Sequence, residues 1–288
     1  MKNTQLSQTL PSPKYLDVNG GRMAYVDQGT GPTVVLIHGT PTYSFMYRHL
    51  INALAEQYRV IAPDHIGFGR SEKPRGWTGT PEDHAGNLRR LLDTLEIRAY
   101  VLVVHDFGGP IGLGAAMRKP EQVRGLVLFN TWMWSTKGTT AEKIGRMAHG
   151  SVLKFLYLHL AFSARILLPA LFAKKTVLTP AIRKAYLAPF VESGSREGTW
   201  NLAKSLSASD PFFSSLYEQR NSIANIPSLV LWGMKDSAFS RQHLKKWEGL
   251  LTRTNVIELP EAGHFPMEEE AEQVISEVTQ FLRSTTRA

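Results

Sequence analysis

The sequence predicts an α/β fold: a mostly parallel, doubly wound sheet with a helical cap inserted between two of its strands. Short runs rich in Val, Ile and Leu recur along the chain and alternate with stretches of helical periodicity. Strands that are apolar on both faces indicate a parallel sheet covered by helices on each side. Residues 131–217 break this rhythm, because they hold several helical runs and no convincing buried strand. We therefore assign residues 1–130 and 218–288 to the core domain and residues 131–217 to the cap.

The expected strands are short apolar runs that end at a Gly-rich turn or a polar loop. In chain order they are Arg22–Asp27, Thr33–Ile37, Arg59–Pro63, Tyr100–Val104, Gly125–Phe129, Ser228–Trp232 and Asn255–Leu259. The expected helices carry apolar residues at spacings of three and four. They include Pro81–Leu95, Pro110–Arg118 and, within the cap, Lys154–Leu168.

The composition excludes several classes of protein. Hydrophobic residues make up 43% of the 288 residues and charged residues 20%, which is typical of a globular chain rather than a disordered one. There is no Cys, so a disulfide framework, a thiol nucleophile and a Cys-ligated metal are excluded. No run approaches the roughly 18 to 20 apolar residues of a membrane span, and the first 20 residues hold no signal-like apolar stretch. We expect a cytoplasmic protein with no membrane partner.

The net charge of +8 raises the question of a nucleic-acid partner. The basic residues are scattered, however, and no block of five or six occurs. Pairs such as Lys174–Lys175 and Lys245–Lys246 are typical of solvated helix faces. We therefore expect no nucleic-acid binding, although the charge favours the attraction of small anions.

The segment HDFGG, residues 105–109, directly follows the buried run Tyr100–Val104 and precedes a predicted helix. This layout of strand, sharp turn and helix is typical of a nucleophile elbow, in which the central side chain is lifted above the sheet. Gly108 and Gly109 supply the small residues that the close approach of strand and helix requires. Asp106 stands where the usual G-x-S-x-G pattern has Ser, so the predicted nucleophile is a carboxylate.

Two further residues each lie shortly after a predicted strand. Asp236 comes after Ser228–Trp232, and His264 comes after Asn255–Leu259. The order nucleophile, acid, histidine, each at the carboxyl end of a strand, is that of the α/β-hydrolase fold. The sequence therefore predicts a catalytic triad of Asp106, Asp236 and His264.

The loop that follows the strand Thr33–Ile37 reads HGTP, residues 38–41. In this fold the loop offers a backbone N–H to the oxyanion that forms during the reaction. We expect the N–H of Thr40 and the N–H of Phe107 to form the oxyanion hole.

A carboxylate nucleophile restricts the substrate class. It is ionised at neutral pH, attacks without the help of a base and forms an ester with the substrate. His264 would then deprotonate a water that attacks this ester, while Asp236 holds the imidazole tautomer. Attack on an acyl carbon would give an anhydride, so an sp³ carbon with a leaving group is favoured, as in alkyl halides, epoxides or β-lactones. The mechanism requires neither a metal nor an organic cofactor.

At these positions the chain resembles the haloalkane dehalogenases, over nearly its whole length from about Gly21 to Leu282. The resemblance is carried by HGTPTYS at 38–44, PDHIGFGRS at 63–71, HDFGG at 105–109, AYLAPF at 185–190, WGMKD at 232–236 and AGHF at 262–265. It implies that Asp106 is the nucleophile, His264 the base and Asp236 the supporting acid. Some members place the acid after the earlier strand, but here Asn130 follows Gly125–Phe129, which favours Asp236.

The chain departs from the family pattern where the leaving group would bind. The family usually carries Trp directly after the nucleophile, whereas Phe107 has no strong donor. Many members also place Asn or Glu where this chain has Thr40. We expect the indole of a Trp in the cap to supply the donor to the leaving group that Phe107 lacks. The candidate pocket residues are Thr40, Phe107, Trp132, Trp134, Tyr186, Pro189, Phe190, Trp200 and Phe265.

Cleavage of a carbon–halogen bond in small haloalkanes is the favoured prediction, and three alternatives stay open. An epoxide hydrolase would use the same triad but needs an acid for the ring oxygen, for which Tyr157, Tyr186 and Tyr217 are available. A β-lactone decarboxylase would also use an Asp elbow. A non-catalytic binding protein usually loses a triad residue, and none is lost here. The partners expected are a small organic substrate, water and a halide product, and the sequence gives no oligomeric state.

Overall fold

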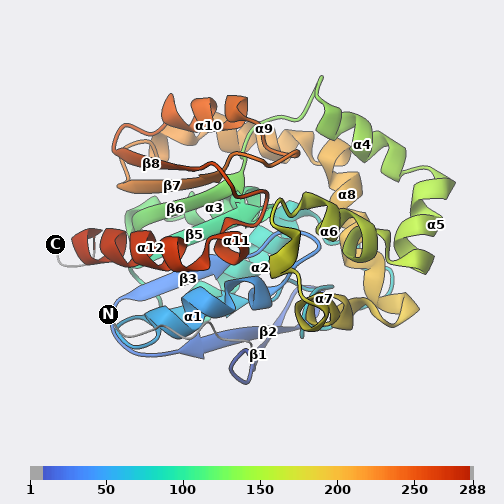
Figure 1. The fold of residues 1–288 in the computed structure, drawn as a ribbon, viewed down its shortest axis with the longest axis horizontal. Coiled ribbons are helices and arrows are strands. Elements are labelled where there is room, and N and C mark those ends of the chain that lie inside the picture. Colours follow the sequence, from blue (N-terminus) through green and yellow to red (C-terminus); the bar gives the residue numbers. More distant parts are fainter. Residues whose placement is uncertain (1–8, 286–288) are drawn as a thin grey trace.

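The computed structural model describes residues 9–285, so the outer limits predicted for the core domain lie outside the described residues. Its centre is an eight-stranded sheet in the order β1-β2-β4-β3-β5-β6-β7-β8 (Figure 1). The strands are β1 (Lys14–Val18), β2 (Gly21–Gln28), β3 (Thr33–Ile37), β4 (Arg59–Pro63), β5 (Tyr100–Asp106), β6 (Val123–Thr131), β7 (Ser228–Gly233) and β8 (Thr254–Leu259). β2 is antiparallel to both of its neighbours, and the strands from β4 to β8 are parallel to one another.

This sheet confirms the predicted fold class, and seven of its strands lie where the apolar runs predicted them. β5 extends beyond the predicted run to Asp106, so the elbow residue is the last residue of the strand. β1 was not predicted. It is an edge strand whose side chains are mostly exposed, so it has no buried apolar run that would reveal it.

Helices cover both faces of the sheet (Figure 1). They are α1 (Arg48–Leu54), α2 (Pro81–Thr94), α3 (Gly108–Ala116), α10 (Arg241–Glu248), α11 (Pro266–Glu269) and α12 (Ala271–Thr285). Side chains of a strand alternate between its two faces, and β3 shows the result. Val35 and Ile37 enter the core shared with α2 and α3, whereas Val34 and Leu36 enter the core shared with α1 and α12. Burial on both faces is the physical reason that the run reads as continuously apolar.

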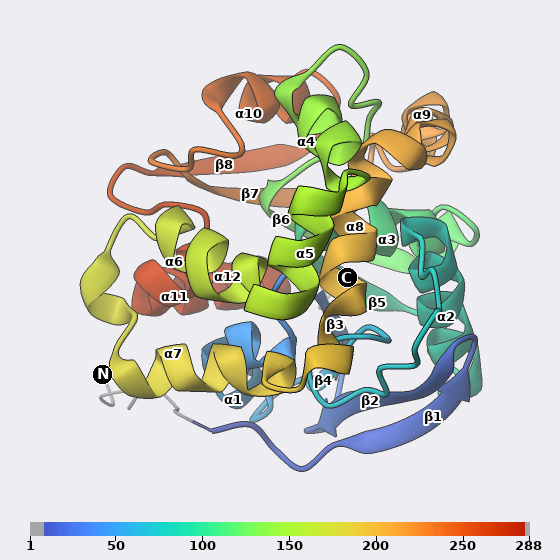
Figure 2. The ribbon, with the colours of Figure 1, turned by 90° about the vertical axis from the view of Figure 1, so that its right-hand side faces the viewer.

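A helical insertion joins β6 to β7, and Figure 2 shows most of it as a layer in front of the strand ends. It contains α4 (Thr140–Ala148), α5 (Ser151–Leu160), the π-helical turn η3 (Ser163–Leu167), α6 (Leu168–Leu171), α7 (Pro180–Leu187), α8 (Glu197–Ala208) and α9 (Asp210–Glu218). Short 3-10 turns complete the chain: η1 (Ser44–Tyr47), η2 (Pro120–Gln122), η4 (Lys175–Val177), η5 (Ala188–Phe190), η6 (Ser193–Arg196) and η7 (Arg220–Ser222).

Two details of the insertion differ from the sequence-based expectation. The single helix expected over Lys154–Leu168 is wrong, because Ala161 adopts the left-handed conformation with φ 51° and ends α5 at Leu160. α9 packs against α3, where Phe212 lies next to Gly114. This helix therefore lies with the core layer, although it falls inside the range predicted for the cap.

Candidate active site

Asp106 occupies a strained turn between β5 and α3. Its φ of 51° is unusual for a residue with a side chain, and such strain is typical of functional positions. The turn fits only because its neighbours are small. A Cβ atom at Gly39 would collide with the Asp106 side chain, and one at Gly108 would collide with the backbone at Ile37. The glycines therefore allow the carboxylate to stand at the end of the sheet as an elbow requires.

The structure brings the three predicted triad side chains together. His264 lies in the loop after β8, and its Nδ1 is 2.8 Å from Oδ2 of Asp236, which lies in the loop after β7. On the other side of the ring, Nε2 is 3.7 Å from Oδ2 of Asp106. All three side chains are buried, and Asp106 is only 8% exposed. An imidazole that donates its Nδ1 proton to Asp236 keeps the lone pair of Nε2 free to accept a proton next to Asp106.

The other oxygen of the Asp106 carboxylate accepts a backbone hydrogen bond. The N–H of Thr40 donates to Oδ1 of Asp106 at 2.9 Å. The backbone N–H of Phe107 acts to lower the pKa of the same carboxyl group. Both groups predicted for an oxyanion hole therefore act on Asp106, and Oδ2 faces His264.

Burial and charge shift the pKa values of the three groups in different directions. Burial raises the pKa of Asp106, although His264 and the two backbone N–H groups act against the rise. Burial opposes ionisation of Asp236 as well, but His264 and the backbone N–H groups of Ala238 and Phe239 outweigh it and lower the pKa. Burial alone would lower the pKa of His264, yet Asp236 and Asp106 together raise it. Two carboxylates in distinct environments around one imidazole are typical of acid–base sites.

Asn130 is a site residue whose role the sequence did not reveal. It follows the apolar part of β6, and its Nδ2 donates to Asp236 Oδ2 at 2.8 Å and to the carbonyl of Gly233 at 3.0 Å. Its Oδ1 accepts the N–H of Gly233 at 2.8 Å. Asn130 therefore ties β6 to β7 and fixes the carboxylate that orients the histidine. Its place at the end of a parallel strand was the available signal.

Trp132 and Phe107 are the two pocket candidates that lie together beside the elbow. Their ring centroids are 4.9 Å apart with the planes nearly perpendicular. The indole Nε1 of Trp132 is buried and has no hydrogen-bond partner among the described residues, and the same is true of the hydroxyl of Thr40. Phe239, which the sequence did not single out, stacks on His264 at 5.6 Å and on Trp132 at 5.5 Å. Buried donors without a protein partner are uncommon, so a water or a ligand atom is the expected partner of these two donors.

Three other pocket candidates make contacts with structural partners rather than with the three residues of the predicted triad. The indole of Trp134 stacks against His243 and Trp247 on α10. The indole N–H of Trp200 donates to the carbonyl of Ala148 inside the cap, at 2.8 Å. The hydroxyl of Tyr186 donates to the carboxylate of Glu268, which also pairs with Arg48. Each side chain has a structural partner that occupies its polar atom or its ring face.

The last three candidates lie at different distances from the chemistry. Phe265 packs with its ring centroid 4.8 Å from that of His264, so it lies directly beside the imidazole. Phe190 packs against Phe68 at 6.4 Å. Pro189 lines a hollow of about 720 Å³ between the cap and core residues such as Tyr43 and Arg70, and none of the triad residues is among the residues that line it.

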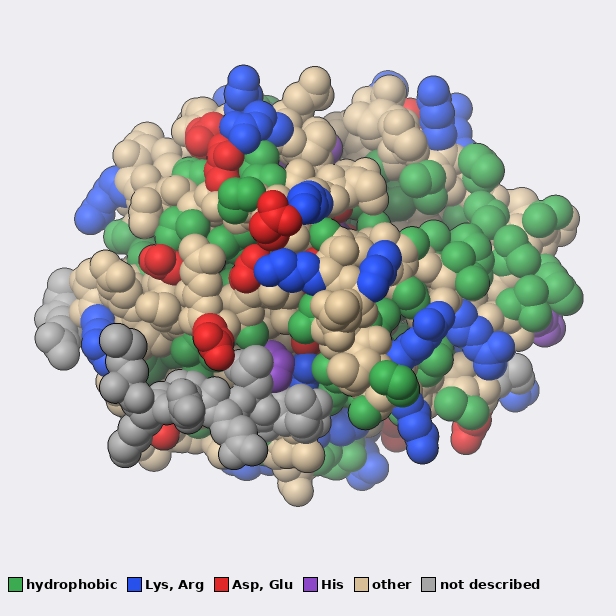
Figure 3. Space-filling model, viewed as in Figure 1, with side chains coloured by type: hydrophobic (Ala, Val, Ile, Leu, Met, Phe, Trp, Pro, Cys, Tyr) green, Lys and Arg blue, Asp and Glu red, His purple; other side chains and the backbone are tan. Residues whose placement is uncertain are grey.

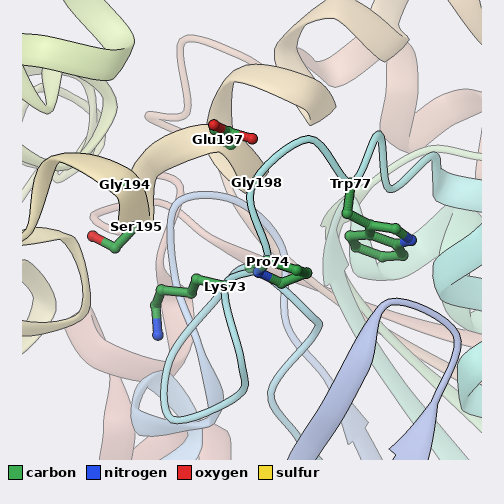
Figure 4. Close-up of a pocket in the computed structure, with 8 residues that line it drawn as sticks. Lys73, Pro74, Trp77, Gly194, Ser195, Glu197 and Gly198 are labelled. Carbon is green, nitrogen blue, oxygen red and sulfur yellow. The ribbon is translucent and has the colours of Figure 1, made fainter.

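A second, much smaller hollow lies between the loop after β4 and the start of α8. Figure 4 shows Lys73, Pro74 and Trp77 on the loop, across from Glu197 and Gly198 on the cap side. Its volume of about 10 Å³ suits one water molecule and excludes an organic substrate. Within residues 9–285, no group of three or more His, Asp or Glu side chains is placed to hold a metal ion.

Comparison with known proteins decides the family. The family described as alpha/beta hydrolase fold matches residues 32–271. The chain belongs to the α/β-hydrolase fold family. It is an enzyme of the haloalkane dehalogenase-like kind, as the sequence predicted.

Two curated relatives and two solved structures illustrate the similarity. Haloalkane dehalogenase 2 of Mycobacterium tuberculosis is 32% identical over 267 residues, which cover 92% of this chain and 93% of the relative. The cis-3-alkyl-4-alkyloxetan-2-one decarboxylase of Shewanella oneidensis is 31% identical over 280 residues, 94% of this chain and 88% of the relative. The ancestral haloalkane dehalogenase AncHLD2 superimposes with a TM-score of 0.86 at 26% identity, over 96% of this chain and 100% of that chain. Haloalkane dehalogenase DbeA from Bradyrhizobium elkani gives 0.85 at 26% identity, over 95% and 98%.

Proposed function

We propose that this hydrolase cleaves the carbon–halogen bond of small haloalkanes through an alkyl ester on Asp106. Oδ2 of Asp106 attacks the carbon, and the halide leaves with the electron pair of the broken bond. His264 then removes a proton from a water that attacks the Asp106 carboxyl carbon, and the tetrahedral intermediate releases an alcohol. The proton leaves His264 for solvent, so the products are an alcohol, a halide and a proton.

The observation that carries this proposal is that the two carboxylate oxygens of Asp106 have different neighbours. Oδ1 accepts the N–H of Thr40 at 2.9 Å, whereas Oδ2 faces Nε2 of His264 at 3.7 Å. The backbone contact to Oδ1 suits stabilisation of the oxyanion that forms when water attacks the ester. The position of Oδ2 near the imidazole suits a nucleophile whose ester is attacked by water that His264 activates.

The unpartnered donors beside the elbow support a halide as the leaving group. The side chain of Phe107 has no strong donor, but the buried Nε1 of Trp132 and the buried hydroxyl of Thr40 have no partner among the described residues. A departing halide would satisfy both donors, which removes the desolvation cost of leaving them empty. Trp132 then takes the role that the family gives to the residue after the nucleophile.

The direct test is a single turnover of a brominated alkane in water enriched in heavy oxygen, with enzyme in excess. We expect the label in the Asp106 carboxylate and an unlabelled alcohol, because the oxygen of the alcohol comes from the enzyme. Label found only in the alcohol would contradict the ester route. His264→Phe should accumulate an adduct heavier by the alkyl group, and Asp106→Asn serves as the control that gains no mass.

A β-lactone decarboxylase is the second candidate, and the decarboxylase relative of Shewanella oneidensis favours it. The same carboxylate would attack the ring carbon, and the ring oxygen would leave in place of a halide. An epoxide hydrolase has less support, because the hydroxyl of Tyr186 is already bound to Glu268. Turnover measured on brominated alkanes, β-lactones and epoxides ranks the three. Turnover of β-lactones with no halide release from any bromide would replace our first proposal by the second.

A further inference from the structure

The insertion carries an unusual amount of exposed apolar surface. Of the eight large hydrophobic side chains that are well exposed among the described residues, seven lie between positions 144 and 191. On α4 they are Ile144 and Met147, the latter 63% exposed, and on α5 they are Val152, Phe155 and Leu160, with Val152 at 72%. Side chains three residues apart share one face of a helix, so Ile144 with Met147 and Val152 with Phe155 each form an outward apolar face. Figure 3 shows hydrophobic side chains gathered at the end of the molecule where Figure 1 places α5.

The same segment carries the net charge of the protein. Residues 143–191 contain eight Lys and Arg and neither Asp nor Glu. The remainder of the chain is balanced, with 25 basic and 25 acidic residues, so the segment accounts for the whole net charge of +8. The basic residues form no continuous block within residues 143–191. The positive charge is concentrated there because the segment contains no acidic residue. Lys143 and Lys184 are exposed, and Figure 3 shows basic side chains beside the apolar ones.

Within the described residues no single helix combines enough length and apolar character to span a membrane. The pair Ser151–Leu160 and Ser163–Leu171 meets those criteria only when joined, and it bends by 75° at the break. A bent pair of short helices with one apolar face is suited to lie along an interface.

We propose that residues 143–191 form a docking surface for an anionic lipid bilayer. An exposed apolar face inserts at the boundary between headgroups and acyl chains, and basic residues around it are attracted to anionic headgroups. Apolar patches of this kind on a single chain mark interaction sites. A protein partner would need matching acidic groups, whereas an anionic bilayer supplies the complementary charge over the whole surface.

This inference revises one expectation from the sequence. We expected no membrane partner because no apolar run is long enough to span, but peripheral binding requires no span. The inference does not depend on the proposed reaction, because it concerns the outer face of the cap and is tested without substrate.

The test is flotation of the full chain with lipid vesicles. We expect the protein to float with vesicles that contain phosphatidylglycerol and to stay behind with vesicles of phosphatidylcholine alone. Binding should weaken as salt rises, because screening shortens the reach of the charges. Failure to float with phosphatidylglycerol vesicles at low salt would overturn the proposal.

Two double variants separate the apolar and the electrostatic parts. Val152→Ser with Phe155→Ser should reduce the partition coefficient at least tenfold. Lys143→Glu with Lys184→Glu should reduce it by about fivefold or more for each changed residue. All four side chains are exposed, so the variants should keep the melting temperature of the original protein, which is measured alongside.

Matched controls lie away from the cap. Tyr15→Ser removes the one remaining well-exposed large hydrophobic side chain, on β1, and should leave flotation unchanged. Arg118→Glu with Arg124→Glu reverses two exposed charges, one just after α3 and one at the start of β6, and should have a much smaller effect than the cap pair. Equal losses in the control and cap pairs would overturn the proposal. A second outcome would also overturn the proposal. If the protein binds no vesicles but forms a dimer, and Val152→Ser with Phe155→Ser abolishes that dimer, the apolar face serves self-association.

Discussion

Trp132→Phe is the substitution that best tests the leaving-group site. The indole is 4% exposed, lies beside Phe107, and carries a buried N–H that has no partner among the described residues. If that N–H donates to the departing halide, its loss removes one donor to a developing anion. Losses of this kind lower kcat by about 10²- to 10³-fold, which corresponds to about 3 to 4 kcal/mol of barrier.

The same substitution should change stability very little. Phe is three heavy atoms smaller than Trp, and the lost burial costs about 2 kcal/mol at roughly 0.8 kcal/mol per group. Removing a buried donor that has no partner stabilises the folded state by about 1 to 3 kcal/mol. We therefore expect the free energy of unfolding to change by no more than about 1 kcal/mol.

The assay is halide release from a brominated alkane in single turnover, with urea unfolding measured on the same protein. Trp134→Phe is the matched control, because this indole packs against His243 and Trp247 rather than beside the elbow. It should leave the rate of halide release within about threefold of the original. An unchanged rate in Trp132→Phe, together with a large loss of stability, would show that this indole only fills space and would refute the reasoning.

Three further predictions concern the charged groups. Asp106→Asn should lower turnover by about 10⁴-fold or more, and it should raise the melting temperature at neutral pH. The melting temperature should rise because burial raises the pKa of Asp106 in the folded state, so the original protein loses stability as pH rises from about 3.8 through that pKa. The gain in melting temperature should therefore vanish in acid. A gain that does not depend on pH would contradict this account. The pKa of His264, followed by NMR, should be lower in Asp106→Asn, since the Asp106 charge raises it; an unchanged value would show that the two groups do not interact. Asp236→Asn should lower kcat by about 10² to 10⁴, and adding Asn130→Asp should recover at least tenfold of that loss, because the two side chains are 2.8 Å apart beside the imidazole. If the double variant is no better than Asp236→Asn alone, the side chain of position 130 does not reach His264.

The positions of the triad could be predicted because backbone geometry determines them. A parallel sheet places the carboxyl ends of its strands at one edge, so residues that directly follow buried runs are brought together regardless of surface detail. Asp106 ends the buried strand β5, Asp236 lies in the loop after the buried strand β7, and His264 lies in the loop after the partly buried strand β8. The structure places the three side chains within hydrogen-bonding reach or close to it. The short β-branched runs were equally informative for the strands, since burial on both faces leaves few alternatives.

The pocket could not be predicted in the same way, because it depends on how the cap packs. Trp132 and Trp134 are two residues apart, yet one lies beside the elbow and the other on α10. Both residues lie in an irregular segment after β6, where no helical or strand periodicity predicts which way each side chain points. The break at Ala161 is also invisible in the sequence, since a left-handed Ala is stabilised by its surroundings and not by its own preference.

The close packing around the elbow has a consequence for how this enzyme can be altered. The backbone at Gly39 and Gly108 lies directly against the elbow, and any added Cβ atom there would strike the Asp106 side chain or the neighbouring strand end. Substitutions at these two positions should therefore disturb the elbow itself. Engineering a new substrate preference has to work through neighbouring side chains such as Trp132 and Phe239, which pack beside the elbow and the imidazole.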